Sequence, residues 1–223
     1  DWYDVILQTA LTQNYNLSLT GGTDRYKSAV NLNYNNQEGT IVYTYSQRYA
    51  VRANNVFQAS DRVKFGLNVS GTYTRGRLTG GSTGISNVIY SAFLMDPQLN
   101  YMNEDGTYPV SFTQPGMFGN ANYYLLLKER EDINSTMRGI VNAYSEIDLI
   151  DNLKYKISLN ADLSSDKNVT WVPSVAKGGL FNAPPNPAQG RYYNGNSYNW
   201  LIENILTWNK TIANDHHVDA LLG

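Results

Sequence analysis

The sequence predicts an all-β protein, a segment of an antiparallel transmembrane β-barrel with long extracellular loops. Three features predict this class. In several segments apolar and polar residues alternate with a two-residue period, as in strands that have one apolar and one polar face. These segments are about as long as the roughly 9–11 residues that cross a bilayer at a tilt. Short and long connections also follow one another along the chain, as the turns and loops of outer-membrane barrels do.

The clearest of these segments runs from Arg62 to Arg75. Between these two arginines, one parity is apolar and closes on an aromatic residue, while the other is polar and uncharged apart from Lys64. Such a pattern suits a barrel wall with lipid outside and water inside better than half of a soluble sandwich. We expect one set of side chains to face lipid (Val63, Phe65, Leu67, Val69, Leu153, Ile157 and Leu159) and another to face the interior (Asn68, Ser70, Lys154 and Ser158).

Other segments repeat this alternation along the chain. They are residues 13–20, 25–35, 47–59, 136–149, 153–163, 198–209 and 217–223, of which 47–59 has the weakest pattern. Together with 62–75 they predict about eight strands. Residues 1–12 indicate a helical turn or a lead-in segment, and residues 88–95 suit a short helix.

The connections predict the sidedness of the barrel. Those around Gly22, Ser60, Asp151 and Asn214 are short, whereas those around Gly39, at 76–133 and at 164–196 are longer. Because outer-membrane barrels place short turns in the periplasm and long loops outside, the first strand would run inward from the cell surface. We therefore expect at least one strand upstream, and treat residues 1–223 as one partial barrel domain of a larger protein.

Composition excludes several classes of function. The net charge is −2 and no basic stripe occurs, which gives no electrostatic case for nucleic acid. The chain has no cysteine, so that neither a disulfide framework nor a cysteine metal site is available. His216 and His217 are adjacent in a strand-like segment, where their side chains would point to opposite faces. We predict neither catalytic residues nor a cofactor or metal site, and thus a protein that is not an enzyme.

Aromatic residues are the best candidates for binding. The two predicted long loops, 76–133 and 164–196, carry many aromatic residues among asparagine and aspartate. Aromatic rings beside polar groups suit sugar rings or peptide side chains, although such rings also pack loops against one another or against a partner. Our candidates for substrate contact are Tyr101, Trp171, Tyr192 and Tyr193.

An ordered set of short motifs spans the whole chain. It comprises Asp1–Leu7, Gln13–Gly22, Asn36–Gly39, Arg48-Tyr49, Arg52–Asn54, Lys64–Gly71, Tyr101–Gly106, Glu203-Asn204 and Ala220–Gly223. Each motif is weak by itself, but in this order the set resembles the early barrel of the SusC/RagA-type TonB-dependent transporters.

The resemblance implies a barrel of about 22 strands with an N-terminal plug and a TonB box, neither of which is in this sequence. It implies TonB-driven uptake of oligosaccharides or peptides across the Gram-negative outer membrane, with a SusD-like surface lipoprotein over the extracellular mouth. Two alternatives stay open at this point. A secreted β-sandwich carbohydrate-binding module would use the same aromatic residues, and a passive porin would differ in lacking a plug.

Overall fold

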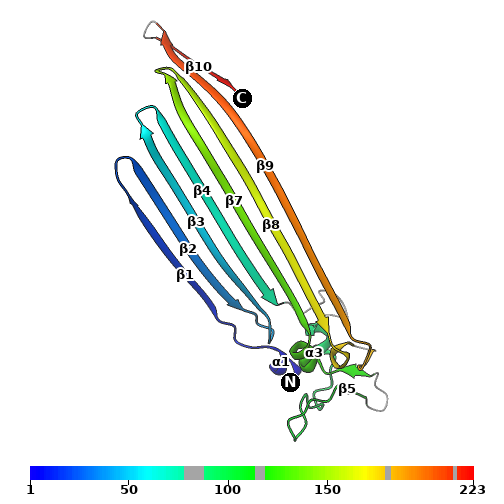
Figure 1. The fold of residues 1–223 in the computed structure, drawn as a ribbon. Coiled ribbons are helices and arrows are strands. Elements are labelled where there is room, and N and C mark those ends of the chain that lie inside the picture. Colours follow the sequence, from blue (N-terminus) through cyan, green and yellow to red (C-terminus); the bar gives the residue numbers. More distant parts are fainter. Residues whose placement is uncertain (78–87, 114–118, 179–181, 213–214) are drawn as a thin grey trace.

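An eight-stranded antiparallel sheet makes up most of the molecule (Figure 1). The computed structural model describes residues 1–77, 88–113, 119–178, 182–212 and 215–223. The strands lie side by side in chain order: β1 (Thr12–Gly22), β2 (Tyr26–Glu38), β3 (Tyr45–Ser60), β4 (Val63–Arg77), β7 (Glu131–Ile150), β8 (Leu153–Val172), β9 (Gln189–Ile212) and β10 (His216–Leu222).

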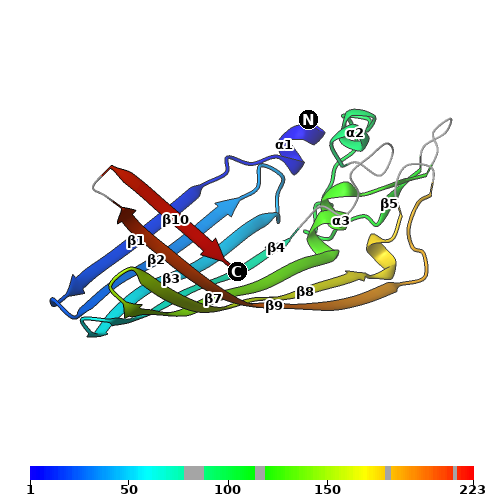
Figure 2. The same ribbon diagram turned by 90° about the horizontal axis from the view of Figure 1, so that it is seen from above.

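The sheet is strongly curved and does not close (Figure 2). Its order, β1-β2-β3-β4-β7-β8-β9-β10, leaves β1 and β10 as its edges. At one end, here called the turn end, tight hairpins join β1 to β2, β3 to β4 and β7 to β8. At the other, the loop end, the described helices gather (Figure 1). An open, curved sheet of neighbouring hairpins is what part of a β-barrel wall looks like.

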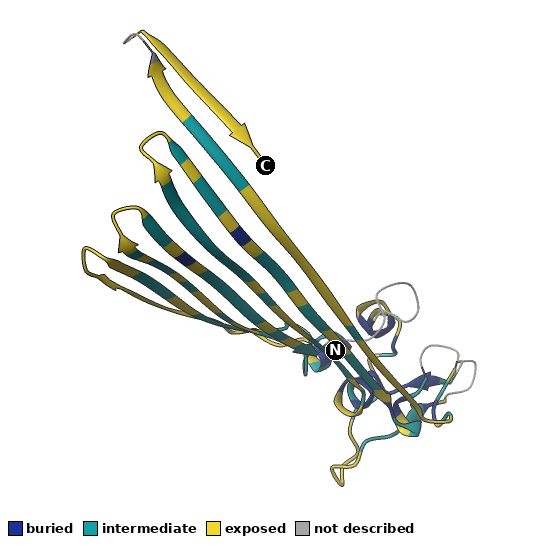
Figure 3. Ribbon diagram, turned by 45° about the horizontal axis from the view of Figure 1, so that its top comes forward, coloured by how far each residue is buried: buried dark blue, intermediate teal, exposed yellow. Residues whose placement is uncertain are grey.

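The burial of the two faces of the sheet is the reverse of that in a water-soluble protein: the apolar face is the more exposed one. Apolar side chains on one face are largely exposed, for example Phe65 at 47%, Leu67 at 43% and Trp200 at 73%. The described residues of the eight-stranded sheet that are buried, Gly66, Ser158 and Val172, share the other face, which is mostly polar. Side chains converge on the concave side of a curved sheet, so the polar face lies inside the curve. Figure 3 shows how little of the sheet is buried.

Residues that pair side by side across neighbouring strands form rows, here called rungs, and two rungs of the apolar face carry aromatic rings. Near the loop end, Tyr15, Tyr34, Tyr49 and Tyr73 pair in register across β1 to β4, and successive ring centroids lie 6.2, 4.9 and 6.3 Å apart. Nearer the turn end, Tyr26, Phe57 and Phe65 form a second row. From Phe65 to Tyr73 is about 27 Å along β4. At a strand tilt of about 40°, the apolar band between the rows is about 21 Å tall.

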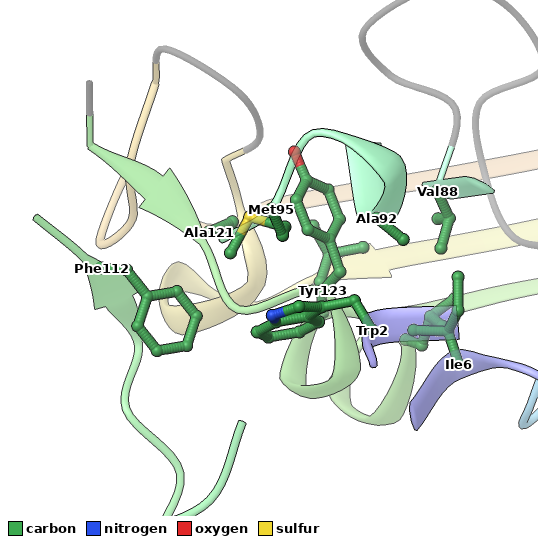
Figure 4. Packing of buried hydrophobic residues seen from close by; sticks show 10 residues of the cluster. Trp2, Ile6, Val88, Ala92, Met95, Phe112, Ala121 and Tyr123 are labelled. Carbon is green, nitrogen blue, oxygen red and sulfur yellow. The ribbon is translucent and has the colours of Figure 1, made fainter. Parts of the chain in front are cut away.

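The hydrophobic core lies at the loop end and not against the sheet's apolar face. It is built from α1 (Trp2–Ile6), α2 (Val88–Phe93), α3 (Tyr123–Glu129) and the short hairpin of β5 (Ser111–Phe112) and β6 (Asn120–Ala121). Trp2 lies at its centre, 3% exposed, with its ring centroid 5.6 Å from that of Phe112 (Figure 4). The indole Nε1 also donates to the Asp96 carbonyl at 3.2 Å.

Arg77 ties this core to the sheet. Standing at the end of β4, its guanidinium Nη2 donates to the carbonyls of Leu127, Lys128 and Arg130, at 2.7, 3.0 and 2.6 Å. These carbonyls belong to the end of α3, where four backbone acceptors have no partner within the helix and a cation is favoured. The loop between β4 and β7 is thereby anchored at both ends.

The eight predicted strands and both predicted helical segments are confirmed. The predicted loop at 164–196 is wrong in its bounds, because β8 continues to Val172 and β9 starts at Gln189. Beyond Leu163 polar residues occupy both faces, so the two-residue hydrophobic period vanishes while the backbone ladder continues. The loop at 76–133 contains α2, α3 and the β5–β6 hairpin, of which the sequence predicted the first. Asn214, predicted to lie in a turn, falls outside the described residues.

Two further observations bear on the fold class. No helix in the described parts of the chain is both long and apolar enough to span a membrane. Besides the main sheet, the described residues form one two-stranded sheet, β5–β6, which packs in the loop-end core. A sandwich would need a second sheet over the exposed apolar face, so the structure does not support that alternative.

Candidate functional site

A connected set of polar side chains covers the concave face at the loop end of β7 and β8. Asn168 is its centre: its Nδ2 donates to Asn134 Oδ1 at 2.6 Å and to Asp132 Oδ1 at 3.2 Å. Thr170 Oγ1 donates to Asn168 Oδ1 at 3.2 Å. These four residues come from facing positions of two paired strands, which hold their side chains parallel. We call them, with Asp166 and Tyr193, the loop-end polar patch.

Tyr193 adds an aromatic ring to this patch. It pairs with Asn168 in the β8–β9 register and thus points to the same face, where it is 58% exposed. One step nearer the turn end, Asp166 accepts from Thr136 Oγ1 at 2.7 Å. An exposed ring beside amides, hydroxyls and two carboxylates can stack on an apolar ligand surface and hydrogen-bond to ligand hydroxyl or amide groups.

The polar face continues toward the turn end as a ladder of paired groups. Arg138 forms a bidentate ion pair with Asp162, with nitrogen–oxygen distances of 2.9 and 2.6 Å. Farther on, amides of neighbouring strands link in a chain, Asn68 to Asn142 at 3.0 Å and Asn142 to Asn160 at 2.6 Å. Groups that satisfy one another in this way make a hydrophilic wall and leave little excess charge.

The structure separates the predicted contact residues. Trp171, Tyr192 and Tyr193 were all predicted to lie in a loop, yet they belong to the paired ends of β8 and β9. Since adjacent strand residues point to opposite faces, Tyr192 faces away from Tyr193. Tyr192 shares the apolar-face parity with Trp171, and both are exposed, at 63% and 46%. Of these three residues, Tyr193 is on the polar face.

Tyr101 lies in an aromatic cluster that the sequence did not reveal. Its ring centroid is 4.8 Å from that of Tyr124 and 6.5 Å from that of Tyr108, and Tyr43 joins the cluster through Tyr124 at 5.8 Å. The hydroxyls of Tyr43 and Tyr124 are hydrogen-bonded at 2.8 Å. That bond, with some burial, raises the pKa of Tyr124 above its usual range. The cluster is half-buried, so Tyr101 mainly packs the loops together.

Pairing across strands is the signal that would have located the patch. Asp132, Asn134 and Asn168 lie in segments where no hydrophobic period marks a strand, and their registers depend on tertiary pairing. In the described parts of the chain no group of three metal-binding side chains converges. The chemistry available at the patch is hydrogen bonding and stacking.

Comparison with known proteins supports this picture. The chain is 30% identical to TonB-dependent receptor P3 of Formosa agariphila over 237 residues, and 25% identical to TonB-dependent receptor P26 of that organism over 224 residues. Each match covers 100% of this chain and 22% of the relative, so the chain spans about a fifth of the length of these relatives. No family model matches the sequence.

Solved structures show the same fold. The RagAB peptide transporter matches with a TM-score of 0.79 at 19% identity, over 99% of this chain and 24% of that one. The RagAB peptide importer in its 'open-open' state matches with a TM-score of 0.78 at 20% identity, with the same coverage. An open sheet that fits a segment of a closed barrel, relatives that are TonB-dependent receptors and motifs that span the chain all agree. The chain is therefore SusC/RagA-like: it is similar over its whole length to TonB-dependent receptors, and it has the fold of a segment of the RagAB transporter.

Proposed function

We propose that the protein to which this chain belongs imports oligosaccharides or peptides across the Gram-negative outer membrane, driven by TonB and assisted by a SusD-like surface lipoprotein. The observation that supports this most is the inverted polarity of the sheet. An exposed apolar band bounded by two aromatic rows suits lipid contact, and a self-satisfied polar face suits a water-filled interior. The relatives and the RagAB transporter add the expectation of nutrient import.

The orientation follows from the lengths of the connections. The tight hairpins of the turn end would lie in the periplasm, and the helices and longer loops outside the cell. The tyrosine row Tyr15 to Tyr73 would then lie at the outer membrane surface. On this orientation the loop-end polar patch stands at the extracellular mouth of the barrel interior, where a substrate arrives.

Tyr193 is the proposed substrate contact among the aromatic candidates. It lies on the polar face beside the Asp132–Asn168 network, which on this proposal lines the interior, and its exposed ring could stack on a sugar ring or an apolar peptide side chain. Tyr101 supports the mouth through its aromatic cluster. We assign Trp171 and Tyr192 to the outer rim of the barrel, because they share the parity of the apolar face.

The adjacent tyrosines provide a matched test. In the full-length transporter, Tyr193→Ala should weaken uptake, and Tyr192→Ala, which removes the same ring from the other face, should not. Truncating one binding anchor costs about 1 kcal/mol or more, which is about a fivefold loss in affinity. The measurement is concentration-dependent uptake of labelled oligosaccharides and of labelled peptides by cells with and without TonB.

Each result has a definite meaning. Equal losses in the two variants would contradict the placement of Tyr193 at the substrate path. Uptake that continues without TonB would favour the passive porin and refute energised import. The substrate class is the one, oligosaccharides or peptides, that competes for uptake by the wild type and competes less well for uptake by the Tyr193→Ala variant.

A further inference from the structure

The tyrosine row on the apolar face ends at β4 and does not extend to the neighbouring strand β7. The residues that pair in line with Tyr73 on the next two strands are Met137 on β7 and Ser165 on β8, so the row carries no ring at these two positions. One rung toward the turn end, Gly71 pairs with Gly139, and both lack a side chain on this face. These two glycines line one end of a hollow of about 610 Å³, which runs along the tyrosine row on the apolar face from Tyr15 on β1 to Met137 on β7.

A second hollow adjoins the first on its loop side. It has a volume of about 400 Å³, and it shares Tyr73 and Met137 with the apolar hollow. Its further lining includes Arg75, Ser135 and Lys167, which form one rung across β4, β7 and β8. Two strand spacings, about 10 Å, separate the backbone positions of Arg75 and Lys167, and Ser135 lies on the strand between them.

The two cations are available for a ligand. Arg75 and Lys167 are exposed, and neither forms an ion pair within the described residues. Lys167 Nζ lies 5.4 Å from the centre of the Tyr192 ring. The ring stabilises the ammonium group but does not cancel its charge. Glu131 is the carboxylate that lines this hollow, four residues along β7 from Ser135 or about 13 Å away. The middle of the hollow is therefore positive.

We propose that these joined hollows bind a phosphorylated membrane lipid. Arg75, Lys167 and Ser135 hold its phosphate, and an acyl chain lies in the trough above Gly71 and Gly139. The inference rests on the proposed function, because it requires the apolar face to lie in a membrane. A lipid fits better than a free anion, since the positive hollow opens directly into an apolar one at the edge of the aromatic row.

The test uses the full-length transporter in phosphatidylcholine nanodiscs doped with phosphatidylglycerol as the phosphorylated anionic probe. Native mass spectrometry measures which lipid stays bound when the protein is released. The wild type should retain phosphatidylglycerol over phosphatidylcholine, and the double variant R75Q/K167Q should lose this preference by about tenfold, equivalent to about 1.4 kcal/mol. Arg48→Gln is the matched control. Arg48 pairs with Thr74, the residue before Arg75, so this change removes a cation at nearly the same place from the opposite face of the sheet.

Gly139→Leu tests the trough separately. A Cβ at Gly139 would meet no atom within 4 Å, so the larger side chain can enter the hollow without displacing the wall. It should lower total lipid retention while the preference for phosphatidylglycerol persists. Inorganic phosphate in the buffer should compete poorly, because it gains nothing from the trough.

Retention that is the same in wild type, R75Q/K167Q and Gly139→Leu would overturn the proposal, as would full competition by inorganic phosphate. Heat-modifiable migration on gels checks that every variant is a folded barrel. A wild-type protein that fails to enter nanodiscs refutes the proposed membrane function. One that enters and shows no preference between the two lipids refutes the lipid site and leaves the proposed function standing.

Discussion

Replacing Val69 by arginine tests the polarity of the wall. Val69 is on the apolar face of β4, four residues from Phe65 and four from Tyr73, midway between the two aromatic rows. With the band about 21 Å tall, its side chain lies about 10 Å from either interface. An arginine there cannot easily reach water, and at the midplane it should destabilise the inserted barrel by about 2–4 kcal/mol.

Asn68→Arg is the matched control, one residue away on the polar face. It removes the hydrogen bond from Asn68 to Asn142, worth about 1 kcal/mol, but it places the new charge in a hydrophilic interior. The Val69 variant should therefore be the less stable by about 1–3 kcal/mol. The assay is equilibrium denaturant titration of the full-length protein in phospholipid bilayers, followed by heat-modifiable migration on gels.

Two outcomes would refute this reasoning. If Val69→Arg were as stable as the wild type, the apolar face would not lie in lipid. If Asn68→Arg were the more damaging change, the polar face would be packed or lipid-exposed and the wall would be reversed. Because both changes introduce the same side chain at nearly the same height, differences in synthesis or general charge cannot explain a contrast between them.

Three further predictions concern the two ends of the sheet. Single cysteines at Gly106 and Asn152, treated with an impermeant thiol reagent on intact cells, should react at Gly106 alone, and strong labelling of Asn152 would reverse the orientation. Asn122→Ala should destabilise α3 by about 2–3 kcal/mol, because the side chain caps two helix amides and donates to two loop carbonyls, and unchanged amide exchange in α3 would contradict this. Hydrogen bonds from the hydroxyl and amide of Thr107 hold the pKa of Asp105 below its ordinary value, so this turn should be most ordered above about pH 4 and loosen as pH falls through the lowered pKa, whereas Asp105→Asn should show no such dependence in amide exchange at Thr107.

The strands within the band could be predicted from sequence because two environments meet there. Each residue faces either an apolar or a polar surrounding, and strands such as Arg62–Arg75 record that contrast residue by residue. The short hairpins were also predicted, since the stretch from Gly21 to Asp24 and the pair Asp151-Asn152 are rich in turn formers, although Gly21 and Gly22 themselves end β1. The fold class needed nothing more than these two signals.

The site could be predicted less well because its geometry depends on register. Tyr192 and Tyr193 are equivalent as neighbours in a polar stretch, and the pairing of β9 with β8 decides which of them lies on the polar face. The aromatic cluster of Tyr101 with Tyr124 joins residues from separate parts of a long loop, which no local pattern connects. α3 was missed because its apolar residues, in Tyr123–Glu129, are too few to show a helical period.

The wall is not equally tall around its curve. Beyond the rung of the tyrosine row, β2, β3 and β4 each continue for four residues, about 14 Å, to Glu38, Tyr45 and Arg77. β8 and β9 continue for seven residues, about 24 Å, to Val172 and Gln189. The loop-end polar patch lies on this taller part, above the apolar band. On the proposed orientation both faces of that part would meet water, which explains why its sequence loses the hydrophobic alternation. Tyr193 and its polar neighbours would then lie where a substrate arrives from outside the membrane.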